Sequence, residues 1–183
     1  MNDELIFQYV GVEAGSLQPI KALRNGKDGA LVFIRNSQNQ WVLGRKNFYP
    51  EGMAKLIGGG IEDGESPLNA AQRELKEEVG IDFDLDRLVP LIHAEVTGKV
   101  NDKIASFSVF VFYAQTNQSM VAASDIDGFK FLSDAEMHQF LDQMSRLPND
   151  AIEPDHPATW NDWGHVWEPI HRAAFERSKE MGL

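Results

Sequence analysis

Glutamates and consecutive glycines gather in one short stretch of the sequence. Glycine fills positions 58–60, and Glu74, Glu77 and Glu78 follow. Like charges about one turn apart on a helix repel, so these carboxylates gain from a cation among them. Oxygen ligands select hard cations such as Mg²⁺ or Mn²⁺, and Mg²⁺ completes its shell with waters and substrate phosphates. Each feature alone is common on solvated helices and in turns. Together they favour a metal–phosphate site, since glycine permits close backbone approach.

A helix must hold the glutamates, and its ends are well marked. Ser66 is an N-cap candidate, Pro67 suits the first helical position, and Gly80 is a C-terminal stop. One face of this helix carries an apolar stripe made of Leu68, Ala71, Leu75 and Val79. The carboxylates share another face, so the helix buries one side and offers the other to a ligand.

The complete spacing has a known counterpart. The stretch reads Gly59, five residues, Glu65, seven residues, Arg73-Glu74-Leu75, one residue, Glu77-Glu78, one residue, Gly80-Ile81. It resembles the Nudix box of the Nudix hydrolase superfamily, with every defining position filled. The resemblance implies an α+β Nudix fold, in which a mixed β-sheet is sandwiched between α-helices. It also implies hydrolysis of a nucleoside diphosphate linked to another moiety.

The same resemblance implies roles for individual residues. The metal ligands would be the carboxylates of Glu74, Glu77 and Glu78, together with the carbonyl of Gly58. Arg73 and Glu65 would anchor the loop to the helix. Glu65, Glu77 and Glu78 are the candidate catalytic residues. Mg²⁺, for which Mn²⁺ can substitute, would neutralise the diphosphate and activate a water near neutral pH.

The general base and the substrate contacts stay open. Candidates for the base are Glu77, Asp125, Asp127 and Glu95. Candidates for substrate contacts are Arg45, Lys55, Asp125 and Asp127. For the residues outside the box, a plain surface role is the stronger interpretation. Phe48 and Tyr49 could stack on a base, although packing within their loop is the default.

Apolar runs predict the remaining elements. Strands are expected at 5–13, 54–58, 87–96, 104–116 and 128–133, with a hairpin formed by 29–35 and 41–46. Ser133 and Glu136 form a capping box that opens a second helix. A proline-rich loop over 146–159 precedes a helix from about residue 163, which is broken or restarted at Pro169. We therefore expect a Nudix hydrolase domain over 1–145, with 1–24 as an N-terminal strand and extension. Residues 146–183 form a C-terminal loop and Trp-rich helical extension that packs on the domain.

Trp160, Trp163 and Trp167 allow several interpretations. They could wall a substrate pocket or a dimer interface, but core packing is favoured because buried aromatics are common.

Composition limits the function. The formal net charge is −11, which disfavours nucleic-acid binding and with it an RNA-decapping role. The chain has no cysteine, which suits the cytoplasm and excludes disulfides, zinc–thiolate sites and the catalytic cysteine of diphosphate isomerases that resemble this family. We expect no signal peptide and no membrane partner. A homodimer is possible. The alternative to an enzyme is a non-catalytic, nucleotide-sensing Nudix domain.

Overall fold

Seven strands form one mixed sheet in the computed structural model, which describes residues 6–15, 17–123 and 126–183. The strand order is β1-β5-β6-β2-β3-β7, and β4 pairs with β2 beside this path. The pairs β1–β5 and β2–β6 are parallel, while the other pairs are antiparallel. The strands are β1 (Gln8–Glu13), β2 (Gly29–Arg35), β3 (Trp41–Arg45), β4 (Ile57–Gly60), β5 (Val89–Val100), β6 (Lys103–Gln115) and β7 (Gly128–Leu132).

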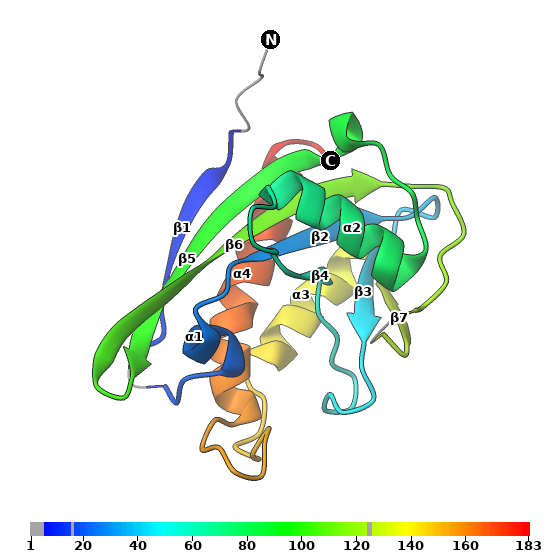
Figure 1. Ribbon diagram of the computed structural model, residues 1–183. Coiled ribbons are helices and arrows are strands. Elements are labelled where there is room, and N and C mark those ends of the chain that lie inside the picture. The colour runs from blue at the N-terminus through cyan, green and yellow to red at the C-terminus, as the bar shows by residue number, and fades with distance from the viewer. Residues whose placement is uncertain (1–5, 16, 124–125) are drawn as a thin grey trace.

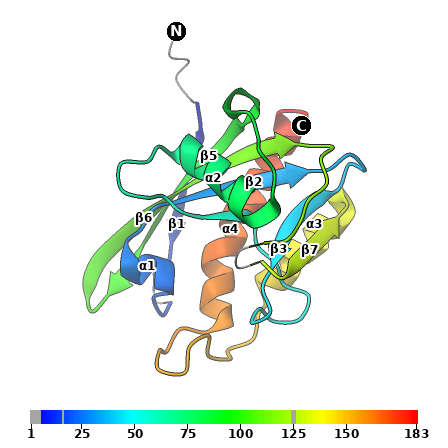
Figure 2. The same cartoon turned by 45° about the vertical axis from the view of Figure 1, so that its right-hand side comes forward.

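Helices cover both faces of the sheet. They are α1 (Lys21–Asn25), α2 (Pro67–Val79), α3 (Asp134–Met144) and α4 (Trp160–Glu180), with a 3₁₀ turn at Leu85–Arg87. Figure 1 shows α2 in front of the sheet and α4 behind it. The turned view in Figure 2 keeps this order, and both views place α1 beside the N-terminal half of α4. This arrangement is the predicted sandwich of a mixed sheet between helices.

The two faces explain the long apolar runs of the central strands. In β2, Leu31 and Phe33 belong to the core under α3 and α4, whereas Val32 and Ile34 belong to the core under α2. Alternate side chains of a strand point to opposite faces, so a strand covered on both sides is apolar throughout.

Helix α2 begins and ends where the sequence predicts. The Ser66 hydroxyl accepts a hydrogen bond from the backbone N–H of Asn69 at 3.2 Å, and Gly80 adopts the left-handed conformation with φ of 70°. Ala71, Leu75 and Val79 of the apolar stripe are fully buried, while Leu68, its first residue, is partly buried. The cap and the stripe together fix the rotation of the helix, and with it the direction of the glutamates.

Helix α4 differs from the prediction in two ways. It begins at Trp160 rather than near residue 163, because Thr159 and Asp162 form a capping box. It also continues through Pro169 without a break. Trp167 before the proline and Ile170 after it are both buried in the same core, so packing outweighs the cost of about 3 kcal/mol of a mid-helix proline.

The other elements agree with the predictions apart from their ends. The hairpin and the capping box of α3 are confirmed. β4 begins at Ile57 rather than at 54, and the helix α1 is not predicted. Residue 5 of the predicted strand 5–13 lies outside the described residues, and β1 begins at Gln8. No helix in the described ranges has both the length and the apolar character needed to cross a membrane.

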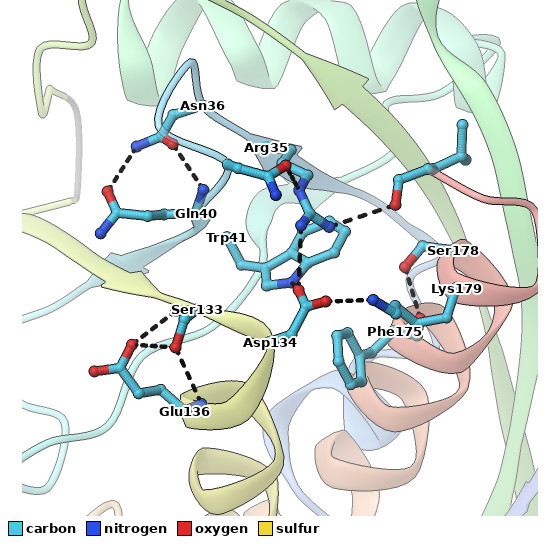
Figure 3. A network of polar contacts seen from close by, with 12 residues as sticks. Arg35, Asn36, Gln40, Trp41, Ser133, Asp134, Glu136, Phe175, Ser178 and Lys179 are labelled. Carbon is cyan, nitrogen blue, oxygen red and sulfur yellow. Dashed lines mark hydrogen bonds and ion pairs between the residues drawn. The ribbon is translucent and has the colours of Figure 1, made fainter.

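A polar cluster ties the end of the chain to the domain (Figure 3). Asp134, the first residue of α3, accepts hydrogen bonds from Trp41 Nε1 at 2.8 Å and from Arg35 Nη2 at 3.2 Å, and it also pairs with Lys179 of α4. Burial alone would raise the pKa of Asp134, but the hydrogen bonds from Lys179 and Trp41 hold that pKa below its usual value. Helix α4 thus shares core and polar contacts with the sheet, while a domain division at residue 145 stays a prediction.

Candidate active site

Glu74 and Glu78 lie where α2 faces the glycine strand β4. Both side chains are buried, and the Glu78 Oε2 atom accepts a hydrogen bond of 2.7 Å from the backbone N–H of Gly58. Glu77, one step around the helix, is exposed. The helix therefore directs two of the three predicted metal-ligand carboxylates inward and one toward solvent.

The backbone at Gly58 and Gly59 requires glycine. Gly58 has φ of 129°, and a Cβ atom there would lie 2.2 Å from the carbonyl oxygen of Ala30. A Cβ atom at Gly59 would lie 2.6 Å from Glu74 Oε1. Only glycine lets the strand and the carboxylates approach this closely.

Arg73 connects the loop after β4 to the glutamates. Its Nη2 atom donates to the carbonyl oxygen of Gly60 at 2.9 Å and to Glu65 Oε2 at 3.0 Å, while Nε donates to Glu65 Oε1 at 3.0 Å. Its Nη1 atom donates to Glu74 at 2.8 Å and to Glu77 at 3.1 Å. One guanidinium thus neutralises part of the carboxylate charge and holds the loop on the helix.

The titration behaviour of this cluster follows from these contacts. Hydrogen bonds from Arg73 hold the pKa of Glu65 below its ordinary value. Burial raises the pKa of Glu74, and the hydrogen bond from Arg73 offsets part of that effect. The pKa of Glu74 thus stays above its ordinary value, because the effect of burial exceeds that of the hydrogen bond from Arg73.

A comparison with protein families identifies the family to which the chain belongs. A family model described as NUDIX domain matches residues 26–155, which is more than half of the chain. The chain belongs to the NUDIX domain family. A curated Nudix hydrolase of Deinococcus radiodurans is 35% identical over 57 residues, which are 29% of this chain and 33% of that protein. The chain thus matches about a third of the length of that relative.

Solved structures share the fold of this NUDIX protein. The NUDIX domain of Shewanella oneidensis NrtR, complexed with ADP ribose, is 14% identical, covers 90% of this chain and 94% of its own, and gives a TM-score of 0.56. The mMutator MutT protein from Bacillus halodurans is 22% identical, covers 62% and 72% respectively, and gives a TM-score of 0.52. At these identities the likeness shows the fold, and it confirms the predicted Nudix architecture.

The predicted ligands of the NUDIX site suit a hard cation by their chemistry, since the carboxylates and the Gly58 carbonyl offer only oxygen. Within the described residues, however, no group of three His, Cys, Asp or Glu side chains is arranged so that it could hold a metal ion. Arg73 pairs with Glu74 and Glu77, and Glu78 is turned onto the backbone of β4. The donor set fits a divalent cation, provided that Arg73 gives up at least one carboxylate.

Two hollows adjoin the glycine strand of the NUDIX site. A small one, of about 20 Å³, lies over Glu78 and Gly58 and is lined by Lys46 and Lys55 as well. A larger cavity, of about 550 Å³, lies beside Gly59 and Gly60. Tyr49 and Lys55 line both hollows. These two side chains therefore belong to the walls of both spaces.

The structure separates the predicted substrate contacts. Lys55 lies at the site, with its Nζ atom 4.1 Å from the ring centroid of Trp167. Arg45 and Asp127 are exposed, and the described residues that line the two hollows include neither of them. Asp127 instead accepts a hydrogen bond from the backbone N–H of Asn47 at 2.5 Å. Asp125 lies outside the described residues.

Glu95 and the three tryptophans of α4 were also candidates from the sequence. Glu95 lies away from the glutamates, and the tryptophans have two roles. Glu95 is exposed on β5, where it accepts a hydrogen bond of 2.8 Å from the Tyr9 hydroxyl. The three tryptophans of α4 are at most 9% exposed, as core packing predicts, yet they also line the larger cavity. Sequence reasoning missed the basic wall of that cavity, because α1 carries no periodic signal in its short length.

Proposed function

We propose that this protein hydrolyses a diphosphate bond in a nucleoside diphosphate linked to another moiety, and that the reaction depends on Mg²⁺ or Mn²⁺. The observation that carries this proposal is the contact between α2 and β4. The buried carboxylates of Glu74 and Glu78 lie against a glycine backbone, and Glu78 also lines the small hollow beside it. Oxygen ligands packed against a backbone without side chains are the combination that suits a hard cation and the phosphate oxygens it binds.

In the proposed roles, Glu74, Glu77, Glu78 and the Gly58 carbonyl hold the cation. A bound divalent cation would supply charge neutralisation and lower the pKa of water near neutral pH. Glu77 is the exposed box carboxylate, so it is the residue best placed to exchange a proton with solvent. Lys46 and Lys55 line the hollow over Glu78, so their positive charges would attract phosphate oxygens to it.

Arg73 and Glu65 act on the position of the loop in this proposal. Arg73 contacts the Gly60 carbonyl, so it fixes the end of the glycine strand relative to the helix. When it releases Glu77 to a cation, its bonds to Glu65 still hold the loop. A role of Glu65 in the chemistry itself is the weaker alternative, since both its carboxylate oxygens accept hydrogen bonds from Arg73.

A second candidate function is nucleotide binding without hydrolysis. Arg73 already pairs with Glu74 and Glu77, so these carboxylates have a cationic partner without a metal ion, which favours a site that binds a nucleotide but does not cleave it. The NUDIX domain of NrtR was solved with ADP ribose, which makes that compound a suitable first ligand for both candidates.

A substrate panel separates the two functions. ADP-ribose, nucleotide sugars, oxidised nucleoside triphosphates and other diphosphates are incubated with Mg²⁺, with Mn²⁺ or with a chelator, and release of monophosphate or pyrophosphate is measured. We expect at least one compound to be cleaved with either cation and none with the chelator. Saturable binding of a compound that is never cleaved would establish the non-catalytic function instead.

A matched pair of variants controls the panel. Glu78→Gln removes a proposed metal ligand, whereas Glu62→Gln removes an exposed carboxylate from the adjoining loop. Only Glu78→Gln should lose the cleavage activity.

A further inference from the structure

The larger cavity is walled by aromatic rings. We call it the aromatic cavity, and its rings come from Phe48, Tyr49, Phe107, Trp160, Trp163 and Trp167. Its volume of about 550 Å³ is that of a small-molecule site. Phe48 stands out because 66% of its surface is exposed, although its ring lies 6.3 Å from that of Trp160 at an interplanar angle of 30°. A large exposed ring that is nearly parallel to an indole offers a planar ligand two stacking partners.

The aromatic cavity is also basic. Lys21, Arg24, Lys27 and Lys55 line it, against two acidic residues, Asp28 and Glu153. Both acids are engaged, because Asp28 accepts from the Ser108 backbone N–H at 2.7 Å and Glu153 pairs with Arg24 at 2.9 Å. An excess of positive charge in one cavity of a chain of net charge −11 indicates an electron-rich or anionic ligand.

Arg24 has a buried donor nitrogen, Nη1, without a hydrogen-bond acceptor in the described part of the chain. A buried unpaired donor costs about 1–3 kcal/mol, so a small rotation of the guanidinium toward a ligand acceptor would be favourable. Arg24 thus adds hydrogen-bonding capacity to the wall of the aromatic cavity.

The position of the cavity relates it to the glutamates. Gly59 lines the cavity, and the Cβ direction of the same residue points at Glu74. A molecule whose diphosphate lies at the carboxylates can therefore reach the cavity across the width of the single strand β4. The walls contributed by α1 and α4 lie outside the NUDIX match of 26–155, so the family match does not include this part of the site.

We propose that the aromatic cavity binds the nucleobase of the substrate, stacked between Phe48 and Trp160 and hydrogen-bonded to Arg24. This inference rests on the proposed function for the position of the diphosphate. A nucleobase is planar and rich in acceptors, so it uses both the rings and the basic wall. An aliphatic chain would fill the same volume but leave Lys21, Arg24 and Lys27 without a partner at the ligand.

Tryptophan fluorescence tests the inference without any turnover. Three of the four tryptophans of the chain line the cavity, and Trp41, the fourth, is fully buried in the core. The four common nucleoside 5′-monophosphates, ribose 5-phosphate and geranyl monophosphate are titrated in the presence of Mg²⁺. None of them contains a diphosphate, so none can be cleaved, and all share the phosphate. We expect at least one nucleotide to change the emission saturably and to bind at least 10-fold more tightly than ribose 5-phosphate.

Two pairs of variants localise the binding. Phe48→Ala should weaken nucleotide binding on the order of 10-fold through lost stacking, whereas Phe131→Ala, at another exposed aromatic residue, should not. Arg24→Ala should weaken it as well, with Arg177→Ala as the control, because Arg177 also has a buried nitrogen without an acceptor in the described chain. Thermal unfolding of each variant shows whether it is folded.

Three results would overturn the inference: ribose 5-phosphate binding as tightly as the nucleotides, geranyl monophosphate binding more tightly than all of them, or a folded Phe48→Ala protein with unchanged affinity. Failure of hydrolysis does not affect this assay, so loss of the proposed function and loss of the nucleobase site are distinguishable. A protein that binds nucleotides here but cleaves no diphosphate retains the nucleobase site as a non-catalytic domain.

Discussion

Arg73 donates two parallel hydrogen bonds to Glu65, from Nε to Oε1 and from Nη2 to Oε2, each of 3.0 Å. This pairing leaves only Nη1 for the carboxylates of α2. The loop between β4 and α2 is thus held by one half of the guanidinium, while the other half contacts the proposed metal ligands. Anchoring and charge balance depend on the same side chain.

Arg73→Lys should therefore lower the free energy of unfolding by about 1–3 kcal/mol, since lysine cannot reproduce the planar fork at a partly buried carboxylate. Urea titration followed by circular dichroism measures the change. Lys76→Gln is the control, because Lys76 and its partner Asp82 are 67% and 80% exposed and their pairing is worth little. Equal losses in both variants would show that Arg73 acts as an ordinary surface charge.

Gly58→Ala should be among the most damaging single substitutions in the site. The φ of 129° and the approach of 2.2 Å to the Ala30 carbonyl predict a loss of about 2–6 kcal/mol from strain and overlap. Gly11→Ala is the matched strand variant, because a Cβ atom there meets nothing within 4 Å. Thermal unfolding of the two variants measures the difference in their stability. Similar melting temperatures would contradict the close approach between residue 58 and the Ala30 carbonyl oxygen.

The sequence could predict the parts of the site that depend on residues close together in the chain. The direction of Glu74 and Glu78 follows from local signals, because Ser66 and Gly80 fix the helix and its stripe fixes the rotation. Thr159 and Asp162 form a comparable cap at the start of α4, but the prediction did not use this pair and placed the start near residue 163.

A pocket wall was one interpretation of the tryptophans in the sequence, but no local signal located the aromatic cavity. It forms where α1 meets α4, and Arg24 pairs with Glu153 from a segment 129 residues away. The spacing of the tryptophans predicts burial equally well for a solid core and for a cavity wall. Only the tertiary arrangement shows that they serve both purposes.

His171 should make the fold sensitive to acid. Its Nε2 atom accepts a hydrogen bond of 3.0 Å from the Leu56 backbone N–H, and its Nδ1 atom lies 2.7 Å from the carbonyl oxygen of Trp167. The ring is therefore neutral with the proton on Nδ1, and burial lowers the pKa of His171 to about 3. The unfolded chain binds the proton below about pH 6.5, so this contribution to stability is complete above that pH and declines as the pH falls toward 3.

The expected slope is about 1.4 kcal/mol of unfolding free energy per pH unit in that window. Urea midpoints measured from pH 7 to pH 4 give the slope, and His171→Gln should flatten it. His165→Gln is the control at an exposed histidine on the same helix. If the unfolding free energy of the His171→Gln variant depends on pH as steeply as that of the parent, the His171 ring is not neutral and buried as described.

Divalent cations should stabilise the folded chain, because they relieve the repulsion among carboxylates that Arg73 only partly balances. At a Mg²⁺ concentration 100 times the dissociation constant, the gain is about 2.7 kcal/mol. Differential scanning calorimetry with Mg²⁺ and with a chelator measures it, and Glu74→Gln should reduce the gain. An unchanged melting temperature at 10 mM Mg²⁺, or an equal rise in the Glu74→Gln protein, would contradict a cation site at these residues.

The most direct test of the proposed hydrolysis is the turnover number of Glu78→Gln on the best compound of the substrate panel. Glutamine retains an oxygen that can accept the hydrogen bond from Gly58, so the contact between α2 and β4 survives while the carboxylate charge is lost. We predict that kcat falls by about 100-fold or more with an unchanged melting temperature. A folded Glu78→Gln protein that cleaves the diphosphate as fast as the parent would contradict the assignment of this site.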